Sequence, residues 1–320
     1  MTSVLRQVLI LRPLAIFAIA LISGSVTSVS VAAGEACQHA YNSNKIQSAS
    51  NANLVGLLER GFDPSEYARH LRSRNPSHAD QILDETTKLM TIDTVVKFEP
   101  LGGGVNASFK ITYSSGLQAV YKPVNPDRPN QPIREMVAYR LSRLLGLDIV
   151  PPTVAGKIQG PAVPTDYLNQ AGSIQVFVKN ATVLTKGKNA DGQKILLFKG
   201  NEFKIDRVIS GRRLRVFDWL INNHDRGSNA GNYLISDIDG VVIGIDHSVS
   251  FVGMDKQARS DKAPYYREKF LNDAEFFAKL TSKTEVEIRE SLRGLNPTRI
   301  EEFLGRYQQL LNEFRRVLGI

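Results

Sequence analysis

Cysteine and tryptophan are scarce in this sequence, which has one of each in 320 residues. A single thiol cannot form an internal disulfide or supply a cysteine-rich zinc site, so neither a disulfide nor such a zinc site stabilises the fold. The chain is 42% hydrophobic and 22% charged, which excludes the collagen-like and wholly disordered classes. A hydrophobic core must stabilise it, and the length suits one large domain or two packed lobes.

The charge excess is also small. Lys and Arg number 40 against 32 Asp and Glu, a formal net charge of +8. Such a charge is compatible with anionic partners such as nucleotides, phospholipid headgroups or acidic proteins. Net charge alone does not distinguish among these classes. We expect no nucleic-acid partner, and an anionic membrane surface is one candidate.

Long hydrophobic runs are missing except near the start, where residues 14–22 are apolar but too few for a membrane span. Arg6 and Arg12 precede this run, and Ala33 ends a small-residue segment. This pattern predicts a signal peptide over residues 1–33, with an uncleaved anchor as the alternative. Cleavage would remove two arginines and leave a net charge of +6. We therefore expect a secreted, periplasmic or secretory-lumen protein, and delivery into another cell is consistent with this.

The mature chain begins with a leader, residues 34–93, whose first part is polar and without a hydrophobic period. Asp63 before Pro64 predicts the start of one helix in this leader, and Ser77 predicts the start of a second. Alternating β-branched and aromatic residues over 94–122 then predict a three-stranded antiparallel meander. Helical spacing follows from Glu135 to Leu145.

The second half of the sequence is mainly helical. We expect strands over 150–154 and 173–178, and an exposed loop in the Gly- and Lys-rich stretch 186–202. A core helix over 206–222, a β-hairpin over 232–245 and a long helix from Asn296 come next. The expected fold class is α+β, with a β-rich N-lobe over 94–178 and a mainly helical C-lobe over 179–320.

Three glycines, Gly102, Gly103 and Gly104, lie between two predicted strands and are followed by Ser108. Glycines let the backbone approach a phosphate and direct N–H groups at its oxygens, although a tight turn has the same composition. Lys122 ends the third strand and Glu135 lies on the next helix. A lysine that contacts nucleotide phosphates needs a fixed carboxylate partner, but each residue alone is also typical of an exposed surface.

Two acidic motifs follow in the second half. The loop from Asn223 to Asn232 contains Asp225, and Asp246 comes at the end of an apolar strand. Phosphoryl transfer needs a carboxylate that orients or deprotonates the acceptor hydroxyl, and an amide oxygen and a second carboxylate that hold magnesium. A buried aspartate costs several kcal/mol unless it is paired or binds a cation, so Asp246 is a candidate ligand.

In this order, the motifs resemble the phosphatidylinositol 3/4-kinase catalytic domain over residues 95–255. The most similar members are the type II phosphatidylinositol 4-kinases, on the segments AVYKP (119–123), GSIQVFV (172–178), DRG (225–227), NYLI (232–235) and ID (245–246). The resemblance implies a bilobal protein-kinase-like fold and transfer of the γ-phosphate of ATP to a hydroxyl, with Mg²⁺ or alternatively Mn²⁺.

The resemblance also implies roles for individual residues. By this resemblance, Lys122, Asp225 and Asp246 would be catalytic residues, and Asn232 and Asp246 would bind the metal. ATP would be bound by Gly102, Gly103, Gly104, Ser108, Lys122, Glu135, Gln175, Phe177 and Val178, the last three leading into a hinge at the adenine.

The sequence departs from the family pattern at three points. The catalytic loop is two residues longer, so either Asn229 or Asn232 could hold the metal, and we favour Asn232 because the strand follows it directly. No cysteine-rich palmitoylation motif is present, and His247-Ser248 replaces Asn-Gly. The acceptor therefore stays open between a phosphoinositide and a protein, the latter for a secreted or effector-type protein kinase, with a pseudokinase as the lesser alternative. Basic candidates for an anionic headgroup are Lys179, Lys186, Lys188, Lys194, Lys199 and Lys204.

Overall fold

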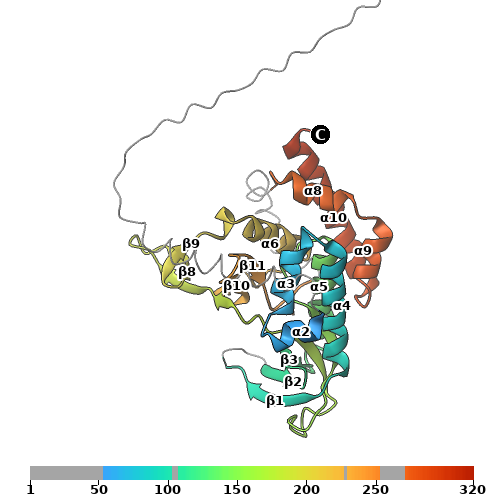
Figure 1. The fold of residues 1–320 in the computed structure, drawn as a ribbon. Coiled ribbons are helices and arrows are strands. Elements are labelled where there is room, and N and C mark those ends of the chain that lie inside the picture. Colours follow the sequence, from blue (N-terminus) through green and yellow to red (C-terminus); the bar gives the residue numbers. More distant parts are fainter. Residues whose placement is uncertain (1–52, 103–106, 227–228, 253–270) are drawn as a thin grey trace, which may run out of the picture.

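A computed structural model describes residues 53–102, 107–226, 229–252 and 271–320. Two lobes are visible in Figure 1, a β-sheet lobe at the bottom and a mainly helical lobe above it. The predicted signal peptide and two of the three loop glycines, Gly103 and Gly104, lie outside the described residues.

The N-lobe is built on a five-stranded antiparallel sheet in the order β1-β2-β3-β5-β4. Its strands are β1 (Val95–Pro100), β2 (Phe109–Tyr113), β3 (Gln118–Pro123), β4 (Thr153–Lys157) and β5 (Ala171–Val176). The predicted meander is confirmed, although β4 begins at Thr153 rather than at residue 150. Side chains alternate along β3, so Ala119 and Tyr121 are buried while Val120 and Lys122 face the opposite side. This alternation presents the Lys122 ammonium to helix α5 (Gln131–Leu144).

Among the residues described from position 53 onward, three helices precede the sheet, one more than the two predicted. They are α2 (Leu54–Glu59), α3 (Pro64–Arg72) and α4 (Pro76–Ile92). Asp63 caps α3 as predicted, but α4 is capped by Asn75 rather than Ser77, because Pro76 occupies the first turn and the Asn75 side chain accepts from the His78 amide. The helices share one hydrophobic core with the sheet, in which Tyr67 and Ile82 are fully buried.

The expected exposed loop over 186–202 is instead a small antiparallel sheet. It contains β7 (Thr185–Lys188), β8 (Lys194–Phe198) and β9 (Asn201–Phe203). The prediction was wrong because this stretch also contains an apolar run at residues 195–198 and Phe203, and Leu196, Phe198 and Phe203 pack against the C-lobe core.

The C-lobe surrounds a second hydrophobic core. Its elements include β6 (Ala181–Val183), η1 (Ile205–Arg207), α6 (Ile209–Leu220), η2 (Ala230–Asn232), β10 (Tyr233–Ser236), β11 (Val242–Gly244), α8 (Ala274–Thr281), α9 (Glu285–Ser291) and α10 (Pro297–Leu318). The predicted hairpin and the Asn296-capped terminal helix are confirmed, while α6 begins after the short turn η1. Among the described residues, no helix is both long and apolar enough to cross a membrane.

Candidate functional site

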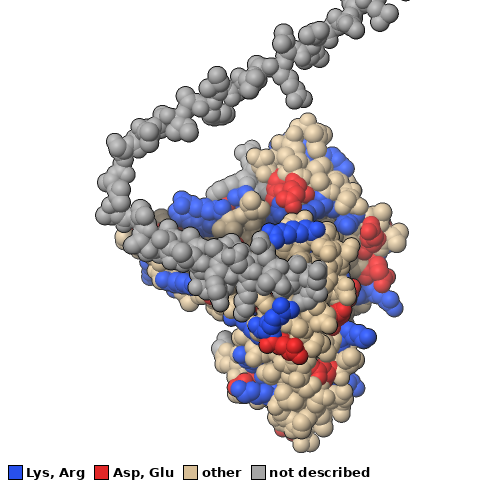
Figure 2. Space-filling view, in the orientation of Figure 1, with Lys and Arg blue, Asp and Glu red and all other residues tan. Residues whose placement is uncertain are grey.

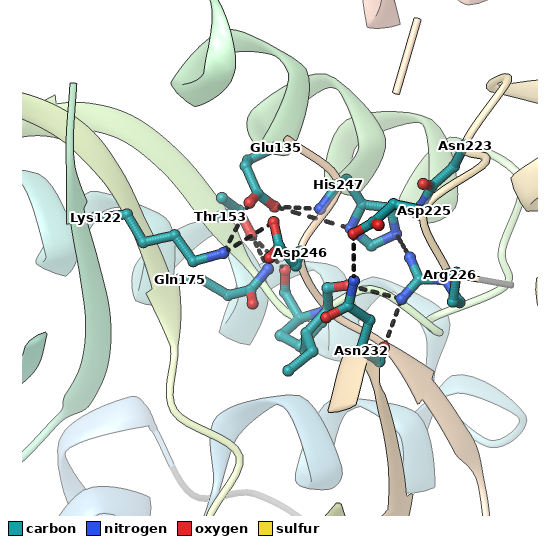
Figure 3. A network of polar contacts seen from close by, with 12 residues as sticks. Lys122, Glu135, Thr153, Gln175, Asn223, Asp225, Arg226, Asn232, Asp246 and His247 are labelled. Atoms are coloured by element: carbon teal, nitrogen blue, oxygen red, sulfur yellow. Dashed lines mark hydrogen bonds and ion pairs between the residues drawn. The ribbon is translucent and has the colours of Figure 1, made fainter. Parts of the chain in front are cut away.

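A lysine bridge joins the two lobes at the centre of the site (Figure 3). Lys122 Nζ lies 3.0 Å from Glu135 Oε1 and 3.2 Å from Asp246 Oδ1. Lys122 comes from the sheet and Asp246 from the segment after β11, so two carboxylates, one of them 124 positions away in the chain, converge on one ammonium.

Electrostatics favour the charged forms of Lys122 and Asp246, whereas burial raises the pKa of Glu135. Burial disfavours the Lys122 charge, but Glu135 and Asp246 outweigh it and raise the pKa of the ammonium. Burial likewise opposes the charge of Asp246, yet Lys122 and the Ser248 hydrogen bonds hold the pKa of that carboxyl below its usual value. The Asp246 side chain remains 35% exposed, so its carboxylate is open to a ligand.

The backbone presents Asp246 in a strained conformation. Its φ is 56°, the left-handed region that non-glycine residues rarely adopt. Just before it, the Ile245 amide donates to the Asn232 carbonyl over 3.1 Å, which fixes the Asp246 segment to the catalytic loop. Positive φ at a functional position is typical of a backbone held by its surroundings.

The catalytic-loop candidates also meet in space. Asn232 Nδ2 donates to Asp225 Oδ2 over 3.0 Å, and Asn232 is buried. The Asn229 side chain instead accepts from the Gly231 amide as the N-cap of η2, and this residue is exposed. Asn232 is thus the buried amide beside Asp225, and its role as the metal ligand in place of Asn229 stays a prediction.

Arg226 is a central residue to which the sequence motifs gave no role of its own. It is 1% exposed, and its Nε donates to Asp218 Oδ2 over 2.8 Å. Its Nη1 donates to the carbonyls of Asn232 and Ile245. An acid between two aromatic residues of α6, Asp218 between Phe217 and Trp219, was the available signal, since a buried carboxylate requires a partner.

His247 connects this arginine to the N-lobe helix. Its Nε2 lies 2.7 Å from Arg226 Nη2, and because a guanidinium only donates, Nε2 is the acceptor and the proton sits on Nδ1. Burial and the nearby Arg226 lower the pKa of the imidazole well below its usual value, so the ring is neutral. The His247 amide donates to Glu135 Oε2 over 2.9 Å. His247 thereby fixes the carboxylate that holds Lys122.

The nucleotide-binding candidates line the sheet side of the site. The Leu101 amide donates to the Ser108 carbonyl, which closes the base of the glycine turn, and Gly102 at its start is exposed. Gln175 lies directly across from Val120 and donates to Thr153 Oγ1 over 2.8 Å.

The hinge candidates are used differently from the expectation. The Phe177 amide donates to the Gln118 carbonyl, so the sheet occupies this main-chain donor rather than leaving it for a base. Lys110 Nζ lies 4.2 Å from the centre of the Phe177 ring. Val178 follows and is half-buried.

The donor set fits a magnesium ion bound together with phosphate. Over the described ranges, no group of three or more His, Cys, Asp or Glu side chains is arranged to hold a metal. Asp246 and Asn232 nevertheless supply carboxylate and amide oxygens, and Mg²⁺ is usually held by one or two protein ligands plus substrate phosphates and water.

Fold and site together define the class: the chain has an α+β, bilobal protein-kinase-like fold. The crystal structure of the Golgi casein kinase is similar to it with a TM-score of 0.50 and 15% identity, over 75% of this chain and 78% of that one. The structure of hydra Fam20 with sugar has a TM-score of 0.47 and 14% identity, over 74% and 90%.

Sequence comparison finds a curated relative of unstated function. Protein Rv2133c of Mycobacterium tuberculosis is 30% identical over 172 residues, which cover 45% of this chain and 59% of that protein. The chain thus spans less than two thirds of this relative's length. No protein-family model matches the chain.

Proposed function

We propose that this protein is an ATP-dependent kinase that transfers the γ-phosphoryl group to a hydroxyl. The observation that carries the proposal is the Lys122 ammonium held between Glu135 and Asp246. A cation fixed on the sheet beside a partly open carboxylate of the other lobe is the arrangement that kinases use for nucleotide phosphates and their metal.

The reaction assigns one task to each group. The acceptor oxygen attacks the γ-phosphorus, the bond from this phosphorus to the β–γ bridging oxygen breaks, and ADP leaves. Asp225 takes the hydroxyl proton, and Asn232 holds the Asp225 carboxylate in place. Lys122 would contact the phosphates, and the glycine turn that begins at Gly102 and includes Gly103 and Gly104 is the sequence-predicted cover for them. Asp246 and Asn232 would hold Mg²⁺, or Mn²⁺, and the ion would neutralise phosphate charge.

A basic sheet beside the catalytic loop supports an anionic acceptor. Strand β7 packs against η2, which ends at Asn232. In the β7–β8 register Lys188 lies directly opposite Lys194, and Lys186 is on the same face. Like charges directly opposite are unfavourable without an anion, so the pair favours an anionic ligand. Figure 2 shows basic side chains at the left edge of the C-lobe, where β8 and β9 lie in Figure 1.

The other lysines of the predicted group contribute less to that surface. Lys199 pairs with Asp237, and Lys204 lies 3.5 Å from Glu202. Lys179 is half-buried in the segment after β5. We propose a phosphatidylinositol headgroup as the first acceptor, because the motif resemblance points to it, and a protein acceptor as the second. His247-Ser248 in place of Asn-Gly is the sequence feature that keeps the second open.

The test uses the purified protein with labelled Mg-ATP. Asp246→Ala should lower phosphoryl transfer at least a hundredfold, while Asp166→Ala, an exposed aspartate between β4 and β5, should leave it unchanged. Equal turnover by Asp246→Ala and the unmodified protein would contradict the proposal. Labelled ATP is also supplied, with the enzyme, to phosphatidylinositol vesicles and in parallel to a mixed protein extract. The fraction that becomes labelled identifies the acceptor.

A further inference from the structure

Helix α3 lies against both lobes, although none of the proposed catalytic groups belongs to it. Its Tyr67 and Leu71 are buried in the core shared with the N-lobe sheet. Figure 1 shows α3 beside the hairpin β10–β11 as well as above the sheet. Polar residues on another face of the same turns, at positions 63, 66 and 69, contact the rest of the protein.

Two of these residues bind the segment that links the lobes. Asp63 Oδ2 accepts from the Lys179 amide over 3.2 Å, while its Oδ1 caps the helix. Glu66 Oε2 accepts from Asn180 Nδ2 over 3.0 Å, and Glu66 is 5% exposed. Lys179 and Asn180 lie between the last N-lobe strand, β5, and the first C-lobe strand, β6.

The third residue reaches the C-lobe itself. Arg69 Nε lies 3.2 Å from Asp239 Oδ2, and the two side chains are only 10% and 15% exposed. Asp239 is in the turn between β10 and β11, the strands that follow Asn232 and precede Asp246. At this burial the loss of one partner leaves a poorly solvated charge, so the pair resists separation of the lobes.

We propose that α3 is a positioning clamp, with Arg69 and Asp239 as its closure, that sets the separation of the two halves of the site. This rests on the proposed function. Lys122 belongs to one lobe and Asp246 to the other, so their 3.2 Å contact depends on how the lobes are held. Nucleotide binding needs both groups in place, because Lys122 would contact the phosphates and Asp246 their metal ion, so a buried strap across the hinge acts mainly on nucleotide binding.

A charge swap in the full chain tests the clamp. Arg69→Asp and Asp239→Arg should each raise the KM for ATP about tenfold with a smaller change in kcat. The double variant, in which the two charges are exchanged, should return the KM close to that of the unmodified protein. Arg69→Gln and Asp239→Asn serve as milder single variants if reversal prevents folding. Arg289→Ala is the control, because Arg289 makes exposed ion pairs with Glu285 and Glu301 away from the hinge.

A second measurement does not need catalysis. Hydrogen exchange of residues 177–184 should become faster in the single variants and return to the original rate in the swap. Single variants with unchanged exchange and KM would overturn the clamp, and so would a swap that restores neither. If the unmodified protein turns over no ATP, the proposed function fails while the exchange experiment still decides the clamp.

Discussion

Individual side chains in this site serve more than one partner. His247 accepts from Arg226 through Nε2 and donates its main-chain amide to Glu135. Because it is fully buried, no water can replace the acceptor that its ring supplies. A single imidazole therefore couples the catalytic loop to the carboxylate that holds Lys122.

This coupling predicts different outcomes for two substitutions. His247→Phe leaves Arg226 Nη2 without its imidazole acceptor and should lower the free energy of unfolding by about 1–3 kcal/mol. His247→Asn keeps a carbonyl oxygen near that position and should lose less. Urea unfolding of the three proteins measures the difference, and equal stabilities for Phe and Asn would show that the hydrogen bond contributes nothing.

Neighbouring elements approach closely where the site is built. Gly172 on β5 lies opposite Pro123 on β3, and a Cβ on it would overlap the Lys122 carbonyl and the Tyr121 ring. Gly156 on β4 lies opposite Gly172 on the other side, where a Cβ would meet Ile174 Cδ1 at 3.6 Å, an ordinary contact. The two glycines thus lie opposite each other in the sheet, but only Gly156 has room for a Cβ atom.

We expect Gly172→Ala to push β5 away from β3 and to move Lys122. The variant should lose about 1–3 kcal/mol of stability, as overpacked sites do, and should turn over ATP more slowly. Gly156→Ala should change both quantities little. Thermal unfolding and steady-state kinetics measured on both variants would disprove this account if Gly172→Ala behaved like Gly156→Ala.

At the scale of the whole molecule, the lobes are joined by buried polar contacts as well as by the connecting segment. Among the titratable groups of these contacts, Glu66 is the one whose pKa burial raises, and Asn180, Asp63, Arg69 and Asp239 are the polar and charged groups that face it. Burial raises its pKa from 4.5 to about 7, with only partial compensation by the Asn180 hydrogen bond. The unfolded chain releases this proton at lower pH than the folded protein does.

Stability linked to Glu66 is therefore fully present below pH 4.5 and is lost as the pH rises to about 7. Glu66→Gln keeps an acceptor for Asn180 and removes the ionisation. The variant should gain roughly 2–3 kcal/mol over the unmodified protein at pH 8 and almost nothing near pH 4.5. Urea unfolding at both pH values tests this, and a stability difference that does not change with pH would contradict it.

Much of this architecture could be predicted from local sequence patterns. The alternation in 94–122, the Asp63 and Asn296 caps and the hairpin around Asp239 depend on near neighbours in the chain, and all appear in the structure. The sheet over 185–203 was missed because its strands are short and its apolar face is defined only by packing on the C-lobe core.

The candidate site divides in the same way. The sequence by itself determined which chemical groups are available, Lys122, Glu135, Asp225, Asn232 and Asp246, and their order along two lobes. Only the tertiary structure decided that one ammonium contacts Glu135 and Asp246, that Arg226 and His247 lie between the loops, and that α3 spans the hinge. Those contacts join residues from 13 to 124 positions apart, and their existence depends on how two hydrophobic cores pack rather than on any local pattern.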